Sequence, residues 1–114
     1  PGYDKTGVSA TATPAKVALV GGKRVTSGTK GIQVTWKSTA NAQAYNVYRA
    51  ANPPSGDVPA SAWVLVGKKV NALTFKDTTG KSGTLYAYTV RGVAVDGKTL
   101  SAAYNKYGVR VTMP

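Results

Sequence analysis

The side chains able to carry chemistry in this sequence are few. It contains no histidine and no cysteine, and its acidic residues are Asp4, Asp57, Asp77 and Asp96. Triads built on His or Cys therefore lack a base or a nucleophile, and zinc sites of these residues lack ligands. Catalysis by a pair of carboxylates needs two acidic side chains close together, and the four carboxylates here are dispersed along the chain. No spacing indicates a Ser–Lys dyad. We expect no enzyme activity, no catalytic residue, no metal site and no cofactor.

Aromatic side chains are the next groups that could contact a ligand, because exposed rings can stack on sugar rings. An aromatic ring is more often buried in packing, and Trp63 in particular opens a predicted strand and could cover the edge of a sheet. Both interpretations stay open from the sequence. The candidates for ligand contact are Tyr48, Trp63, Arg91, Tyr104 and Tyr107.

The charge is strongly one-sided. Fifteen Lys and Arg residues stand against four Asp, a net charge of +11, which favours association with anionic polymers. The lysines are scattered one or two per element, a distribution that also serves to keep strand edges solvated and unpaired. Attraction to an anionic cell-wall polymer is the functional alternative, whereas no known module's spacing predicts sequence-specific nucleic-acid binding.

The elements that must position these groups are strands. Apolar residues recur with period two, and no window sustains a 3.6-residue repeat, so we expect little or no helix. Seven short strands separated by turn signals predict an all-β, immunoglobulin-like antiparallel β-sandwich, with a barrel as the alternative. The predicted strands are 16–20, 31–37, 44–50, 63–70, 73–77, 84–95 and 109–112.

Turn residues set the expected boundaries of these strands. Gly21 and Gly22 are predicted to close the first strand, and Gly108 to break the chain before the last one. Asp96-Gly97 predicts a two-residue hairpin in which both central residues have positive φ, with residues 98–104 folding back on the preceding strand. Residues 51–61 contain three prolines and are expected to form a long surface loop.

The chain is the length of one domain. Residues 1–14 have the small, polar composition of a linker stub, and residues 15–114 form the predicted sandwich. No run approaches the ~20 apolar residues of a membrane span, so we expect no transmembrane segment. We also expect the protein to be a monomer. The 51–61 loop is a candidate for partner contact, because prolines reduce the entropy lost on binding, and the alternative is that it is a tolerated insertion without a function. Its candidate residues are Pro53, Pro54, Asp57 and Pro59.

Three stretches carry a resemblance to a known family. The run 31–49 contains VTW and YNVYR, the later run is GTLYAYTVRGVAVDGKT, and Pro14 precedes the first strand. Together they resemble a fibronectin type III domain, particularly the variants of bacterial extracellular proteins. The resemblance implies that Trp36 is the core tryptophan, packed by Tyr45 and Val47, and that Tyr86 is the corner tyrosine. Tyr88 and Val90 share the face of Tyr86 and complete the expected structural core.

Two departures from the family pattern bear on function. Gly80 stands where many members have a leucine packing near the corner tyrosine. The Asp96-Gly97 turn would shorten the loop that carries recognition motifs in adhesive members, and no Arg-Gly-Asp sequence occurs, so integrin-type adhesion is not expected. We therefore expect a non-catalytic extracellular module of a larger secreted or cell-surface protein. It would act as a spacer or interaction domain for neighbouring domains, with carbohydrate or anionic cell-wall polymer binding as the alternative.

Overall fold

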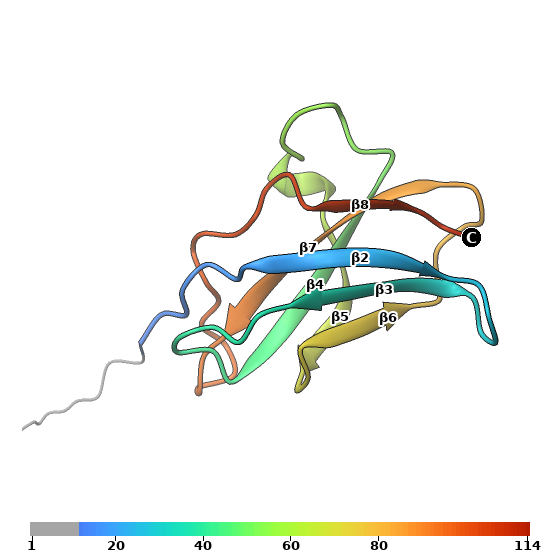
Figure 1. The fold of residues 1–114 in the computed structure, drawn as a ribbon. Helices are drawn as coiled ribbons and strands as arrows, with labels where there is room; N and C mark the ends of the chain where they lie inside the picture. The colour runs from blue at the N-terminus through green and yellow to red at the C-terminus, as the bar shows by residue number, and fades with distance from the viewer. Residues whose placement is uncertain (1–11) are drawn as a thin grey trace, which may run out of the picture.

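The computed structural model describes residues 12–114, which form strands joined by loops and a single turn of 3-10 helix (Figure 1). The prediction of an all-β chain with almost no helix is confirmed. The elements are β2 (Leu19–Val25), β3 (Gly31–Trp36), β4 (Ala44–Ala51), η1 (Ala60–Ala62), β5 (Val64–Val70), β6 (Thr74–Asp77), β7 (Leu85–Val93) and β8 (Val109–Thr112).

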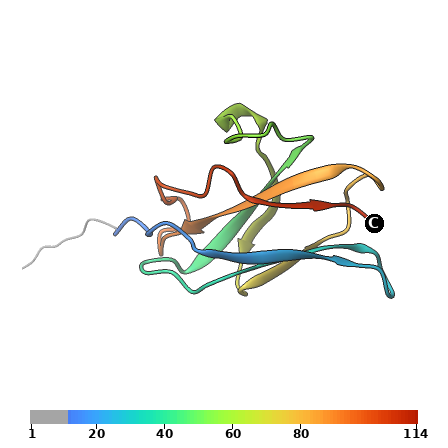
Figure 2. The same cartoon turned by 45° about the horizontal axis from the view of Figure 1, so that its top comes forward.

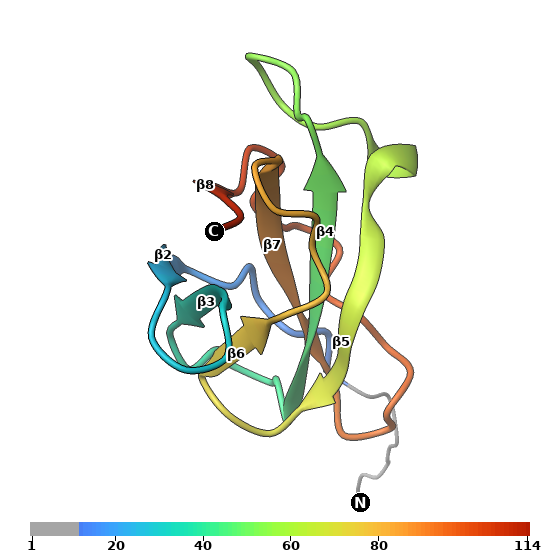
Figure 3. The same cartoon turned by 90° about the vertical axis from the view of Figure 1, so that its right-hand side faces the viewer.

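The strands form two antiparallel sheets, packed face to face as Figure 3 shows. One sheet has the order β2-β3-β6, and the other has the order β5-β4-β7-β8. The longest pairing joins β4 and β7, from Ala44 opposite Val93 to Ala51 opposite Tyr86. The predicted sandwich is therefore confirmed, and the barrel alternative is not observed.

The hydrophobic core lies between the sheets and follows from the period-two pattern of their strands. In β3, Ile32, Val34 and Trp36 are buried, while the intervening Gln33 and Thr35 are half-buried on the outer face. A ring from the opposite sheet meets this strand, since the centroids of Trp36 and Tyr45 lie 5.6 Å apart in a tilted arrangement. Burying each such large side chain contributes roughly 1.5 to 3 kcal/mol. The other large buried side chains are those of Val17, Val47, Tyr86, Tyr88, Val90, Val93 and Met113.

The first strand differs from its prediction. It spans Leu19–Val25, so Gly21 and Gly22 lie inside it and do not close it. Gly22 pairs with Val34, and a Cβ at Gly22 would lie 3.1 Å from Cγ2 of Val111 on β8. The glycine is thus favoured by the close approach of β8 to β2, which Figures 1 and 2 both show, and not by a turn.

The predicted two-residue hairpin at Asp96-Gly97 is wrong. Gly97 has a φ of +73°, but the φ of Asp96 is not positive. The hydrogen bond that closes the turn lies outside the Asp96-Gly97 pair: the N–H of Ala94 donates to the carbonyl of Thr99 at 2.9 Å. The Asp96 carboxylate accepts the backbone N–H groups of Lys98 and Thr99, each at 2.8 Å. This side-chain capping favours a wider turn than the Asp-Gly pair alone predicts.

Residues 98–104 fold back on the preceding strand as predicted, but they form no regular strand. After one bridge between Val93 and Leu100, residues 101–108, which we call the return segment, are irregular until β8 begins. The return segment is tied to the outer face of β7, where the Thr89 hydroxyl donates to the carbonyl of Asn105 at 2.7 Å. The predicted break at Gly108 is confirmed: its φ is +75°, and a Cβ there would lie 2.6 Å from the Tyr88 carbonyl oxygen.

The proline-rich loop is less free than its composition suggests. Val58 is buried against Ala50 and Ala87, and its N–H donates to the carbonyl of Lys106 at 2.8 Å. The loop therefore forms a small second hydrophobic cluster on the outer face of the four-stranded sheet. The prediction of a simple surface loop missed this anchoring, because no local pattern marks a single buried valine among prolines.

The two ends of the described chain lie at opposite ends of the sandwich (Figure 1). Residues 1–11 of the predicted linker stub lie outside the described part. Pro14 is buried, and a Cβ at Gly92 would lie 2.9 Å from the Cβ of Pro14. Within residues 12–114, no helix has the length and apolar character needed to cross a membrane.

Candidate functional site

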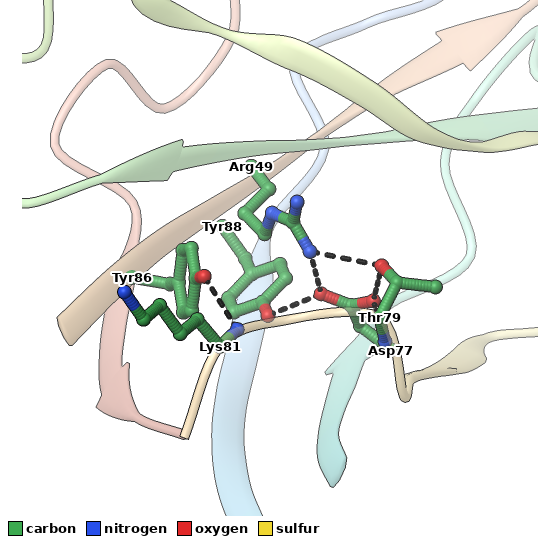
Figure 4. A network of polar contacts seen from close by, with 6 residues as sticks. All are labelled: Arg49, Asp77, Thr79, Lys81, Tyr86 and Tyr88. Carbon is green, nitrogen blue, oxygen red and sulfur yellow. Dashed lines mark hydrogen bonds and ion pairs between the residues drawn. The ribbon is translucent and has the colours of Figure 1, made fainter. Parts of the chain in front are cut away.

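A buried carboxylate at the end of β6 is the centre of a polar network (Figure 4). Asp77 is 1% exposed, and its Oδ2 accepts bonds from Arg49 Nη1 at 2.9 Å and from the Tyr88 hydroxyl at 2.6 Å. Its Oδ1 accepts the N–H of Thr79 at 3.0 Å and the Thr79 hydroxyl at 2.6 Å. Because Arg49 and Tyr88 belong to the opposite sheet, this network ties the two layers together.

The electrostatics of this network favour the ion pair. Burial alone would raise the pKa of Asp77, but hydrogen bonds from Thr79, Tyr88 and Arg49 outweigh burial and hold it below its usual value. Burial and the adjacent Asp77 charge raise the pKa of Tyr88 well above that of a free phenol. Asp77 is therefore an ionised structural acceptor whose two oxygens are both engaged, and the arrangement is that of a cross-sheet brace.

A second tyrosine of β7 fixes the adjacent corner. The Tyr86 hydroxyl accepts the backbone N–H of Lys81 at 2.7 Å (Figure 4). A Cβ at Gly80 would lie 2.1 Å from Cε of Met113 and 2.8 Å from the Tyr86 ring. Met113 thus occupies the space beside position 80, and the corner hydrogen bond forms without a leucine there.

A pocket of about 130 Å³ opens on the outer face of the four-stranded sheet, and we call it the aromatic pocket. Tyr48 on β4 and Thr89 on β7 are paired across the two strands and form its floor. Trp63, just before β5, and Tyr104, from the return segment, supply further rings. Its lining residues are Tyr48, Ala60, Trp63, Thr89, Arg91 and Tyr104.

Arg91 supplies the charge of the aromatic pocket and is held in place. Its Nε and Nη2 donate to the carbonyl of Ser101 at 2.9 and 2.6 Å, and its Cζ lies 5.2 Å from the centroid of the Tyr104 ring. Nη1 makes no hydrogen bond to any residue between 12 and 114. The pocket therefore presents a pre-oriented cation beside an aromatic face.

Trp63 has a packing role as well as a place in the pocket wall. It lies against the cluster of Ala50, Val58 and Ala87, and its Cη2 would lie 3.2 Å from a Cβ at Gly108. Its Nε1 is buried and has no hydrogen-bond partner among the described residues. The packing interpretation of this tryptophan is therefore confirmed, and ligand contact stays a prediction for a ring that also bounds the pocket.

Four of the five candidates for ligand contact are brought together in the aromatic pocket, and Tyr107 is not. Tyr107 stacks on Arg110, whose Cζ lies 3.6 Å from the ring centroid. It belongs to a neighbouring depression of about 370 Å³, which we call the basic hollow. The hollow is lined by Lys16, Asp57, Ala102, Ala103, Tyr104, Asn105, Lys106 and Tyr107.

The candidate partner loop is fastened to the same region. Arg110 donates to the carbonyl oxygens of Pro54 and Gly56, the latter at 2.7 Å. Asp57 lines the basic hollow, while Pro53 is half-buried and Pro59 is exposed. No local pattern marks Arg110 as an anchor of this loop, because its partners in the loop lie more than fifty residues away. For Asp77 a local signal was available, since an Asp side chain often accepts the backbone N–H two residues further on, as it does here from Thr79.

Comparison with known proteins identifies the fold. No protein-family model matches the sequence, and no characterised protein matches it. A solved structure of a Fn3-like protein from Clostridium thermocellum is similar to this chain, with a TM-score of 0.61 and 22% sequence identity. The similarity covers 93% of this chain and 96% of that one. The resemblance to a fibronectin type III-like domain is therefore confirmed at the level of the fold.

Proposed function

From this fibronectin type III-like fold, we propose that the chain is a non-catalytic extracellular module that spaces or presents neighbouring domains of a larger secreted or surface protein. One observation carries the proposal: the described chain begins and ends at opposite ends of the sandwich (Figure 2). Domains attached at the two ends would be held apart by the long dimension of the module.

Both ends are also fastened to the folded body, which a spacer requires. Near the start, Pro14 is buried and the N–H of Ala15 donates to the carbonyl of Ala40 at 3.1 Å. Near the end, Met113 is buried, its N–H donates to the carbonyl of Thr84, and its carbonyl accepts the N–H of Gly83, both at 2.9 Å. Anchored ends transmit position better than a flexible linker does.

The best-connected carboxylates support a non-catalytic role. Asp77 braces the two sheets, and Asp96 accepts bonds from Lys98 and Thr99 in an exposed turn. Hydrogen bonds from Thr99 are the largest cause that lowers the pKa of Asp96, to about 2. Both groups are thus ionised acceptors in structural positions at neutral pH, which suits neither a general acid nor a general base there.

The spacing role can be tested with two spin labels in the parent protein. This sequence has no cysteine, so Thr13→Cys and Thr112→Cys would be the two labelling sites within it, and any cysteine elsewhere in the parent protein would be changed to serine. Both positions are exposed. We expect a narrow distribution of distances between the labels, and a broad one when residues 15–111 are replaced by a Gly/Ser linker of equal length. Equally broad distributions in the two proteins would refute a spacing role.

A second function, carbohydrate binding, is favoured by the convergence of Tyr48, Trp63 and Tyr104 on the aromatic pocket. A pocket of about 130 Å³ is smaller than those that enclose drug-sized ligands, so a glycan would lie across it. Titration with soluble polysaccharides should perturb the fluorescence of Trp63, and Tyr104→Ala should abolish the change. Unaltered fluorescence and unaltered amide chemical shifts with every polysaccharide would rule this function out.

A further inference from the structure

The aromatic pocket and the basic hollow are continuous at one side chain. Tyr104, which is half-buried, lines both depressions. Its ring is stacked on Arg91 on the pocket side, while Lys106 lies on the hollow side two residues further along the return segment. A ligand longer than one sugar ring that occupied the pocket could therefore continue over Tyr104 into the hollow.

The charges along this path are mostly positive. Arg91 lies in the pocket, and the exposed Lys16 and Lys106 lie in the hollow. Asp57 is the one carboxylate that lines either depression in the described part of the chain. Three cations against one anion, within a chain of net charge +11, give a path that attracts a negatively charged ligand.

We infer that the ligand is an acidic polysaccharide whose sugar rings carry carboxylates. This inference rests on the proposed carbohydrate-binding function and specifies its substrate class. One sugar would lie on the rings of the aromatic pocket with its carboxylate at Arg91 Nη1, the guanidinium nitrogen that Ser101 does not occupy. The next sugar would pass over Tyr104, with its carboxylate toward Lys106 and Lys16.

The aromatic rings of the pocket favour an acidic polysaccharide over an anionic polymer that has no sugar rings. A polyphosphate would satisfy the cations but would leave the aromatic faces without a partner. The outer face of the opposite sheet, β2-β3-β6, is also basic and serves as the comparison: Lys23 and Lys76 flank Gln33 there. The shallow depression near Lys23 has no aromatic lining among the described residues. The combination of rings and cations therefore favours the four-stranded face.

The test compares variants with matched loss of charge. Binding of an oligogalacturonate is measured by calorimetry for the wild type, for Lys16→Gln with Lys106→Gln, and for Lys23→Gln with Lys76→Gln as the control pair. The first pair should weaken binding roughly tenfold, since each exposed ion pair is worth up to about fivefold. The control pair should change it less than about threefold. Arg91→Gln should weaken binding at least as much as the first pair.

Probe ligands separate failure of this inference from failure of the underlying function. Dextran, which is neutral, should bind at least about tenfold more weakly than oligogalacturonate, and polyphosphate should leave the fluorescence of Trp63 unchanged. Equal weakening by both lysine pairs, or equally tight binding of polyphosphate, would show attraction by net charge alone and overturn the inference. Dextran bound as tightly as oligogalacturonate would overturn the acidic preference but leave carbohydrate binding intact. No binding of any polysaccharide would refute both proposals.

The variants are chosen so that misfolding cannot imitate the expected result. Lys16 and Lys106 are exposed, and the backbone carbonyl of Lys106, which accepts from Val58, is unaffected by a change of side chain. Arg91 anchors Ser101, so its substitution could loosen the return segment. Unfolding midpoints of all variants are therefore measured, and the lysine pair decides the outcome if Arg91→Gln is unstable.

Discussion

Replacement of Asp77 by Asn would test the cross-sheet brace most directly. The amide keeps the size of the carboxylate, and its oxygen could still accept both bonds from Thr79. The other oxygen becomes an NH2 group, which only donates. Tyr88 can turn its hydroxyl to accept from this group, but the guanidinium of Arg49 only donates and loses its anionic partner. The substitution therefore removes one ion pair and one charge-assisted hydrogen bond from a site that is 1% exposed.

The expected loss of unfolding free energy follows from the burial of Asp77 and Arg49. Breaking a fully buried ion pair costs about 3 to 5 kcal/mol, and a hydrogen bond to a charged group contributes about 1.5 to 3 kcal/mol. The Arg49 side chain is 20% exposed and keeps a bond to the Thr79 hydroxyl at 2.9 Å. Water and this hydroxyl soften the loss, so we expect Asp77→Asn to lower the free energy of unfolding by about 2 to 3 kcal/mol.

Urea unfolding at pH 7 would measure this difference. Asp57→Asn is the matched control, because Asp57 is exposed on the proline-rich loop and its replacement should cause little change. Arg49→Met in the Asp77→Asn background should recover part of the loss, since it removes the unpaired cation. An Asp77→Asn variant within about 0.5 kcal/mol of the wild type, the usual range for neutral surface changes, would refute the brace. Strict additivity of the two substitutions would refute the direct coupling.

The same carboxylate predicts how the difference depends on pH. The pKa of Asp77 in the folded protein lies below its usual value, so the native state favours the ionised form. Its stabilisation is complete above the unfolded pKa of about 4 and is lost as the pH falls through the lower folded pKa. The stability gap between the wild type and Asp77→Asn should therefore narrow below about pH 4. A gap that stays constant through strongly acidic pH would contradict this assignment.

Other perturbations probe the corner and the edge of the sandwich, each followed by urea unfolding. Tyr86→Phe removes the acceptor of the Lys81 N–H and should cost about 1 kcal/mol, so an unaltered midpoint would argue against the corner bond. Gly80→Ala places a Cβ 2.1 Å from Met113 and should cost about 1 to 3 kcal/mol, with a smaller cost in a Met113→Ala background. Lys69→Gly should stabilise by about 0.5 kcal/mol, because Lys69 has a φ of +50°; a loss of stability would contradict this.

Much of the fold was predictable from the sequence because it depends on local pattern. The alternation in GIQVTWK predicts which side chains of β3 enter the core, and the structure buries Ile32, Val34 and Trp36. Seven strand-like runs separated by turn residues were enough to predict the sandwich. The absence of His and Cys limits the available chemistry by composition alone, whatever the fold.

The sequence misled where tertiary contacts override local preference. Gly21 and Gly22 predict a turn by composition, but the approach of β8 to β2 favours a small residue at position 22 inside the strand. Asp96-Gly97 predicts a tight hairpin, yet Asp96 caps a wider turn and the chain returns without regular pairing. In each case the energy of a distant or side-chain contact exceeds the small preference of the local dipeptide.

The residues proposed for binding show the same division. Their types marked Tyr48, Trp63, Arg91 and Tyr104 as candidates in the sequence, since rings and a guanidinium suit ligand contact. Only the tertiary structure decided that these four share a pocket while Tyr107 stands apart. The physical reason is the path of the return segment, which the Thr89 and Arg91 side chains hold on the sheet by bonds to its carbonyl groups. Such long-range contacts leave no periodic trace in the chain, so the sequence supplied the chemistry and the fold determined its location.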